Sequence, residues 1–299
     1  MDAINRISEV FKKSKEVFID DSSRLALISD CHRGDGTSSD SFYKNERLYF
    51  TAINHYYQEG YTYVEVGDGD ELWENRNFYD IQKVHSNVFK FLSKFYNEKR
   101  LYFIYGNHDM IKKDEEFVNR NFYRYFDQRT KSEIPLFEDI KIHEGLVLKY
   151  KREEDKILVI HGHQADFLND DLWVASKYMV RYLWRPLEMF GVKDPTSTAK
   201  NYEKKLAVEK KLVEWVEKEK HILITGHTHR PMFPKVGQPP YFNDGSCVHP
   251  RCITAIEIVD GYITLVKWNI KIREDGVLFV GKDILAGPCK LEDYFNSFN

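Results

Sequence analysis

The chain has 299 residues, 42% of them hydrophobic and 30% charged, which is typical of a soluble globular protein. Its formal charge of -3 lacks the basic excess of nucleic-acid-binding proteins and argues against nucleic acid as a partner. No C-x-x-C pair occurs among Cys31, Cys247, Cys252 and Cys289, which argues against a disulfide framework or a zinc-thiolate site and suits a reducing compartment.

The hydropathy pattern predicts a cytoplasmic protein with no transmembrane segment. No apolar run approaches the roughly 18 residues that span a bilayer. The N-terminus is mixed in charge and lacks the apolar core of a signal peptide. We expect a single domain over residues 1–299, with a helical cap inserted at about residues 167–220.

Strand, polar loop and helix follow one another three times in the first part of the chain. Such alternation predicts a mainly parallel sheet with helices packed outside it, which is an α/β class of fold. The predicted order is a helix at about 4–17, a strand at 24–29, a helix at 43–58, a strand at 61–66, a helix at 78–96 and a strand at 100–105.

The pattern changes in the second part of the chain. Residues 111–140 are charged and aromatic, which favours a helical excursion away from the sheet. Turn signals at Asp260-Gly261 and Glu274-Asp-Gly276 predict antiparallel strands toward the C-terminus. The other predicted elements are a hairpin of strands 146–150 and 157–160, a mostly helical stretch at 167–220 and a strand at 222–225.

Four carboxylates follow the strand at 61–66 in close succession: Asp68, Asp70, Glu71 and Glu74. Open α/β sheets place their ligands at the carboxyl ends of their strands. These negative charges repel one another unless a cation lies among them or water reaches them all. This loop alone therefore leaves a metal site and a solvated acidic turn equally open.

Polar clusters of the same kind follow the other predicted strands. Together they offer carboxylates, an amide oxygen and imidazoles, a mixture that suits Mn, Fe, Zn, Ni or Co better than calcium or magnesium alone. One such cluster is usually an ordinary polar turn, whereas five at strand ends predict a metal site. The clusters are Asp30-x-His32, Gly67-Asp68, Gly106-Asn107-His108-Asp109, His161-Gly-His163 and Gly226-His227-x-His229.

In this order, the five clusters resemble those of the calcineurin-like metallophosphoesterase family, over about residues 24–250. The resemblance implies a β-sandwich flanked by helices (αββα) that binds two divalent metal ions, with Mn favoured. It also implies that Asp68 bridges the two ions. The first ion is then bound by Asp30, His32, Asp68 and His229, and the second by Asp68, Asn107, His161 and His227.

The resemblance also assigns a chemistry to the site. Two ions about 3.5–4 Å apart share a hydroxide that attacks a phosphoester or pyrophosphate bond in line. His108 is then the expected general acid or hydrogen-bond donor to phosphate, and Asp109 is expected to orient it.

Two residues beside the expected ligands are candidates for substrate binding. Arg33 can bind a phosphate through two hydrogen bonds, although a salt bridge to Asp35 or Asp40 is equally open. His163 follows the ligand His161 by two residues, where it faces substrate or supports the ligands.

Within the family, the helical insert resembles that of the UDP-2,3-diacylglucosamine pyrophosphatase-like branch. A cap that presents Lys177, Arg181 and Arg185 beside aromatic residues suits a phosphorylated, partly apolar substrate such as a nucleotide-diphosphate conjugate. Packing of the cap against the body or a dimer partner is equally open. That branch usually carries arginine where this chain has His108, so the sequence leaves the substrate open.

The sequence thus predicts a dinuclear-metal-dependent phosphohydrolase that acts on a small phosphorylated substrate or a phosphoprotein. The alternatives within the fold are a serine/threonine-type protein phosphatase and a phosphodiesterase or nuclease. A non-catalytic scaffold is a remote alternative, because scaffolds of this fold lose metal ligands and every expected ligand is present here.

Overall fold

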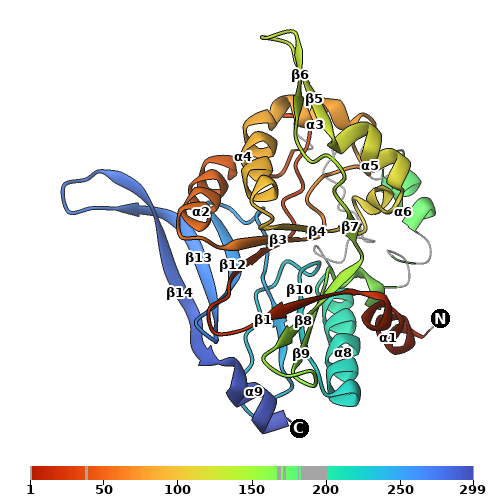
Figure 1. Cartoon of the computed structure of the whole chain (residues 1–299), viewed down its shortest axis with the longest axis vertical. Helices are drawn as coiled ribbons and strands as arrows, with labels where there is room; N and C mark the ends of the chain where they lie inside the picture. Colours follow the sequence, from red (N-terminus) through yellow and green to blue (C-terminus); the bar gives the residue numbers. More distant parts are fainter. Residues whose placement is uncertain are drawn as a thin grey trace.

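Two β-sheets packed face to face form the centre of the computed structural model, and helices cover both outer faces (Figure 1). This mixed α/β arrangement confirms the predicted fold class, a sandwich flanked by helices. None of the described helices is long and apolar enough to cross a membrane. The structure describes residues 2–37, 40–166, 170, 173–180, 182 and 201–298.

The larger sheet has seven strands in the order β14-β13-β12-β2-β3-β4-β7. Strands β2, β3, β4 and β7 are parallel, as the alternation of strand, loop and helix predicts. The three C-terminal strands add to this sheet antiparallel to their neighbours. The strands are β2 (Arg24–Ile28), β3 (Thr62–Val66), β4 (Leu101–Ile104), β7 (Ile142–His143), β12 (Cys252–Val259), β13 (Tyr262–Ile272) and β14 (Leu278–Lys290).

The smaller sheet has five strands in the order β1-β8-β9-β10-β11. Strands β8 and β9 form the predicted antiparallel hairpin, and β10 lies parallel to β9. The carboxyl ends of β9 and β10 therefore lie at one edge of this sheet. Its strands are β1 (Lys15–Ile19), β8 (Gly145–Tyr150), β9 (Lys156–Ile160), β10 (Ile222–Thr225) and β11 (Tyr241–Asn243).

Alternate residues of the strands point to opposite faces of each sheet. Leu27 and Val64 of the larger sheet meet Val159 of the smaller one in the apolar core between the sheets. Ala26 and Ile28 point the other way, into a second core beneath the outer helices. Both faces of the central strands are thus buried, which explains why those strands are apolar throughout.

The helices form the two outer layers. Helices α2 and α4 pack on the larger sheet, and α1 and α8 pack on the smaller one, above and below the sandwich in Figure 1. The helices are α1 (Ala3–Lys13), α2 (Glu46–Gln58), α3 (Phe78–Val84), α4 (Ser86–Asn97), α5 (Glu115–Phe122), α6 (Trp173–Met179), α8 (Tyr202–Glu219) and α9 (Leu291–Phe298), with 3-10 turns η1 (Met110–Lys113) and η2 (His163–Ala165).

Several predicted elements differ from those observed. The N-terminal helix ends at Lys13, and the residues after it form strand β1, because β8 offers a parallel edge for them. The helix predicted at 78–96 is interrupted at His85. Residues 111–140 are only partly helical, since they also contain a hairpin of β5 (Arg124–Asp127) and β6 (Ser132–Pro135).

The predicted cap is only partly described. Its C-terminal portion is helix α8, whose Leu212 and Trp215 are fully buried against the smaller sheet, so this part belongs to the sandwich. Lys177 lies on the short helix α6. Arg181 and Arg185 lie outside the described residues.

Candidate metal centre

The loops after five strands meet at one end of the sandwich. In the larger sheet, β2, β3 and β4 run parallel, so the loops that follow them begin at one edge. In the smaller sheet, β9 and β10 also run parallel. The ligand-bearing loops thus come from both sheets, and the predicted ligands lie where these sheet edges face each other. These ligands are Asp30, His32, Asp68, Asn107, His161, His227 and His229.

The backbone adopts an uncommon conformation at most of these positions. Asp30, His32, Asp68, His227 and His229 all have positive φ, between 49° and 66°. For a residue other than glycine, such a conformation costs about 1–3 kcal/mol, and it persists only where the surroundings over-determine it. Hydrogen bonds hold the backbone in this conformation here. The backbone N–H of His32 donates to the carbonyl of Asp68 (2.9 Å), and the backbone N–H of His227 donates to Asp30 Oδ2 (2.9 Å).

Glycines precede two of the ligands because the backbone is crowded there. A Cβ on Gly67, whose φ is +85°, would lie 2.6 Å from the ring of His161. A Cβ on Gly106 would lie 2.1 Å from Asp68 Oδ1. Each glycine therefore allows a ligand from another loop to approach the chain closely.

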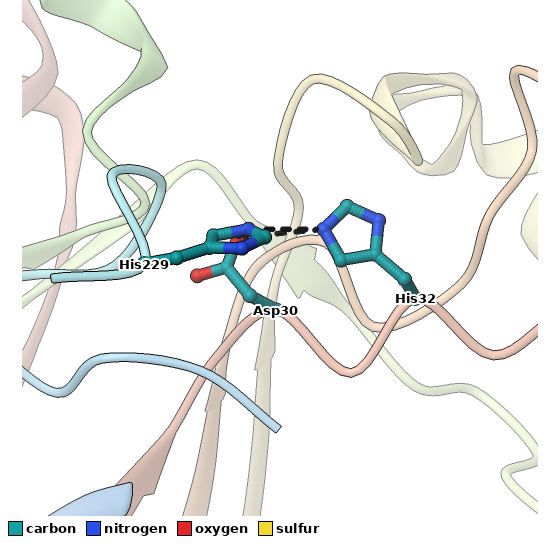
Figure 2. Close-up of side chains that lie close together, drawn as sticks. All are labelled: Asp30, His32 and His229. Carbon is teal, nitrogen blue, oxygen red and sulfur yellow. Dashed lines mark hydrogen bonds and ion pairs between the residues drawn. The ribbon is translucent and has the colours of Figure 1, made fainter. Parts of the chain in front are cut away.

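Asp30, His32 and His229 form a first group of ligands. Figure 2 shows the two imidazoles facing each other, with the carboxylate of Asp30 beside the ring of His229. Asp30 Oδ1 lies 2.9 Å from His229 Nε2 and 3.6 Å from His32 Nε2, and the two Nε2 atoms lie 3.3 Å apart. One cation could contact all three side chains.

Asp68, His161 and His227 form a second group, with Asn107 beside it. His161 Nδ1 donates to the carbonyl of Val66 (2.8 Å), so the ring, once it has lost its second proton, presents the lone pair of Nε2 to the site. That Nε2 lies 3.1 Å from Asp68 Oδ2.

Asp68 joins the two groups. Its Oδ1 accepts a hydrogen bond from the backbone N–H of His108 (2.8 Å), which fixes the carboxylate. Its Oδ2 lies 3.1 Å from His161 Nε2 in the second group and 3.8 Å from His32 Nε2 in the first. Asp68 therefore lies next to both groups, and the bridging role that the resemblance implies for it stays a prediction.

The buried ligand atoms fit a cation. Asn107 Oδ1, His161 Nε2 and His227 Nε2 are buried and form no hydrogen bond within the part of the chain that the structure describes. A buried polar atom without a partner is destabilising. All three atoms can donate a lone pair, and this mixture of N and O suits the metals named above.

The charges around Asp68 shift the pKa values of the ligands. Burial acts to raise the pKa of Asp68, but His161 and His108 outweigh it and hold that pKa well below the usual range. Burial acts to lower the pKa of His161, but the carboxylates of Asp68 and Asp30 raise it to about 9. An imidazole must lose its proton to bind a metal, so metal binding should release protons here.

A family model described as "Calcineurin-like phosphoesterase" matches residues 23–231. The chain belongs to this family. The match covers all the ligands from Asp30 to His229, and it concerns the family as a whole. Assignment to the UDP-2,3-diacylglucosamine pyrophosphatase-like branch stays a prediction.

Two solved structures resemble this chain at low identity. Vps29 from Chaetomium thermophilum is 11% identical with a TM-score of 0.34, over 88% of this chain and 97% of that chain. A candidate 5'-nucleotidase from Staphylococcus aureus, in complex with alpha-ketoglutarate, is 14% identical with a TM-score of 0.33, over 88% of this chain and 53% of that chain. A search of curated proteins gives no match.

Glu71 lies between a metal ligand and the predicted general acid. Its Oε2 is 2.9 Å from His32 Nδ1 and 2.7 Å from His108 Nδ1. Trp73 stacks on the His108 ring, with centroids 4.3 Å apart and an interplanar angle of 22°. The sequence marks Glu71 as one of the acids after strand β3 that could support the ligands or fix the loop, but it does not show that His32 and His108 are its partners.

Asp109 does not orient His108. Its carboxylate accepts hydrogen bonds from the backbone N–H groups of Gly106 (2.7 Å) and Gly69 (3.1 Å), and it pairs with Lys112 Nζ (2.5 Å). Asp109 therefore holds two ligand loops together. The prediction that it orients His108 is wrong, because Glu71 contacts the ring nitrogen instead.

Arg33 is not available to a substrate. Its side chain is fully buried, and it donates two hydrogen bonds to Glu65 (2.7 Å each) and one to Asp70 Oδ1 (2.7 Å). The prediction of a phosphate contact is therefore wrong. The alternative salt bridge to Asp35 or Asp40 is also wrong, because Arg33 pairs with Glu65 on strand β3 and with Asp70 after it.

His163 lies behind the second group of ligands and is fully buried. Its ring centroid is 5.6 Å from that of His161. Burial, with the charges of His161 and His227, holds the pKa of His163 well below its usual value, so the ring is neutral. A buried ring in this position has no direct route to substrate, and its proposed substrate contact stays a prediction.

Proposed function

We propose that this phosphoesterase hydrolyses a phosphoester or pyrophosphate bond in a small phosphorylated substrate, with two divalent metal ions bound. The supporting observation is the position of Asp68 Oδ2, which lies 3.1 Å from His161 Nε2 and 3.8 Å from His32 Nε2. Two ligand groups that share one carboxylate suit a pair of ions that share the substrate phosphate.

The ligand sets follow from the two groups. We propose Mn for both ions, because the family resemblance favours it and it is among the metals that accept mixed imidazole and carboxylate ligands. When bound, such ions neutralise the charge of the phosphoryl group and activate water. Asp30, His32, Asp68 and His229 would hold the first ion, and Asp68, Asn107, His161 and His227 the second.

His108 would supply a proton to the substrate. Burial acts to lower its pKa, but Glu71 and Asp68 outweigh burial and raise it, which favours the protonated ring. Nδ1–H donates to Glu71, which leaves Nε2–H to donate to a phosphoryl or leaving-group oxygen. The side chain is 23% exposed, so a substrate can reach it.

The test is turnover on a panel of phosphomonoesters, phosphodiesters, nucleotide diphosphates and phosphopeptides, each assayed with Mn, Mg, Zn and Co. We expect Mn-dependent hydrolysis, and the preferred group on the panel names the substrate class. Asp68→Asn or His108→Gln should lower kcat/KM by about 100-fold or more, because each removes a group that acts directly on the reaction.

His55→Gln is the matched control for His108→Gln, because His55 lies on α2 among aromatic side chains. It should retain wild-type turnover. Protein that contains both ions by elemental analysis, yet turns over nothing on the panel, would refute hydrolysis.

A further inference from the structure

The loop after strand β11 brings a further carboxyl group to the metal centre. Asp244 directly follows β11, which lies parallel to β10, so this loop begins at the same sheet edge as the loop that bears His227. The backbone N–H of Asp244 donates to the carbonyl of Thr225, the last residue of β10 (2.9 Å), which fixes the loop there. The side chain of Asp244 is fully buried, so it can act on the reaction only through its neighbours.

A single hydroxyl group connects Asp244 to the proposed metal ligand Asp30. Ser29 Oγ lies 2.6 Å from Asp244 Oδ1 and also contacts Asp30 Oδ2, and all three side chains are fully buried. Gly226 leaves room for this contact, since a Cβ there would lie 2.1 Å from Ser29 Oγ. The three side chains therefore form a buried link, Asp244–Ser29–Asp30, which begins outside the ligand sets and ends at a ligand.

The link has one hydroxyl hydrogen for two carboxyl groups. Ser29 can donate only one hydrogen bond, so its second contact needs a proton on a carboxyl group. Asp30 is the group that must be charged, because a carboxylate binds a cation in its deprotonated form. Burial raises the pKa of Asp244 well above its usual range, and Asp244 Oδ2 is buried without a partner among the described residues, which would be costly for a carboxylate. Asp244 therefore donates to Ser29, and Ser29 donates to Asp30.

The link fixes which oxygen of Asp30 faces the other ligands. Oδ2 is held by the backbone N–H of His227 (2.9 Å) and by Ser29. Oδ1 is left for the first ligand group and lies 2.9 Å from His229 Nε2. Rotation of the carboxylate would break both contacts of Oδ2. The link thus holds Oδ1 in place before an ion binds.

We propose that Asp244 is a positioning residue for the first metal ion and acts through Ser29 on Asp30. This role rests on the proposed two-ion function and assigns part of the affinity for one ion to a residue outside both ligand sets. Without the link, binding of the ion must also order the carboxylate of Asp30, which weakens the affinity. The second ion should be little affected, because Asp244 and Ser29 form no hydrogen bond with its ligands in the part of the chain that the structure describes.

The test is Mn binding to the metal-free full chain, measured by isothermal titration calorimetry in two backgrounds. His161→Ala removes a ligand of the second ion, so binding then reports on the first, and His229→Ala does the reverse. In the His161→Ala background, Asp244→Ala or Ser29→Ala should weaken Mn binding by about 10- to 100-fold, which is the usual effect of partners behind metal ligands. In the His229→Ala background, neither change should matter. A residue that only supports the fold would affect both backgrounds or neither.

Further variants separate the link from a loss of folding. Ser29→Ala and Asp244→Ala combined should weaken binding no more than either change alone, because both break the same link. Asp244→Asn should restore the wild-type affinity, since its amide N–H can donate to Ser29 as the neutral acid does. Ser246→Ala is the matched control, because this buried hydroxyl lies in the same loop and accepts from the backbone N–H of Val248 (2.9 Å). It should bind Mn as the wild type does, and far-UV circular dichroism checks that each variant is folded.

Unchanged Mn affinity in Asp244→Ala, or equal losses in the two backgrounds, would overturn the role of Asp244. Additive losses in the double variant would overturn the link through Ser29, and an Asp244→Asn variant as weak as Asp244→Ala would overturn the neutral acid. None of these results depends on turnover. A chain that binds Mn as expected but hydrolyses nothing would refute only the proposed function, whereas a wild-type chain that binds no Mn would overturn both.

Discussion

Glu71 contacts two imidazoles with one carboxylate, and so it connects a proposed metal ligand to the proposed proton donor. Hydrogen bonds to Nδ1 of His32 and His108 turn the Nε2 atoms of both rings toward the site. Burial acts to raise the pKa of Glu71, but His108 and His32 outweigh it and hold that pKa well below its usual range. The carboxylate is therefore charged throughout the neutral range.

Glu71→Gln should lower kcat by about 10- to 100-fold, because partners behind metal ligands have effects of this size. Glutamine has nearly the same shape but lacks the charge that raises the pKa of His108 and aligns His32. The measurement is kcat and KM on the best substrate of the panel, together with Mn content.

Glu116→Gln is the matched control, since Glu116 lies on the exposed face of α5 and pairs with Arg120. It should behave as wild type. If Glu71→Gln matched the wild type in both turnover and Mn content, the carboxylate would have no role in positioning the two rings.

At the scale of elements, the loop after β2 is attached to the helical layer by a buried histidine. His85 lies at the junction of α3 and α4 and is fully buried. Its Nε2 is 2.7 Å from Asp40 Oδ2, and its Nδ1 is 3.1 Å from Glu46 Oε2. Asp40 in turn accepts the N–H of Gly36 (3.0 Å), which shapes the loop that begins at the metal ligands.

This contact should make stability depend on pH. Burial acts to lower the pKa of His85, but Asp40 and Glu46 outweigh burial and raise it. The unfolded value is about 6.5, so the stabilisation is complete below about pH 6.5 and is lost as pH rises through the raised folded pKa. We expect His85→Gln to cost about 2 kcal/mol at pH 6 and clearly less at pH 9.

Urea unfolding of the wild type and of His85→Gln at pH 6 and pH 9 measures the cost of the substitution in free energy of unfolding. His55→Gln is the control, because burial and Lys282 hold the pKa of His55 below its usual value. This shift is opposite to that of His85, so the cost of His55→Gln should not fall between pH 6 and pH 9. A cost of His85→Gln that is constant or rises toward pH 9 would contradict a charged His85.

At the scale of the whole molecule, the sequence predicts those elements and site residues whose structure depends on neighbouring residues in the chain. The clusters at Asp68 and Asn107 are visible because each follows a strand directly, and parallel strands bring their ends together. Strand β1 is not visible, because Val17 continues a helical spacing and only the edge of β8 makes it a strand. The partners of Arg33 are likewise set by tertiary structure, since Glu65 and Asp70 lie more than thirty residues away.

The metal centre also connects the two sheets. Asp30 and Asp68 follow strands of the larger sheet, whereas His161 and His227 follow strands of the smaller one. A ligand that binds only the native state stabilises it by about 2.7 kcal/mol at 100 times its dissociation constant. Bound ions should therefore stabilise the whole sandwich and not only the loops.

We expect saturating Mn to raise the Tm of the full chain by at least about 5 °C over protein treated with EDTA. Asp68→Asn should lose most of this shift, because the shared carboxylate serves both ions. Glu16→Gln, on the exposed edge strand β1, should keep the full shift. Differential scanning calorimetry with Mn and with EDTA measures the Tm of each variant. An equal rise in the Asp68→Asn variant would mean that the ions act elsewhere on the chain.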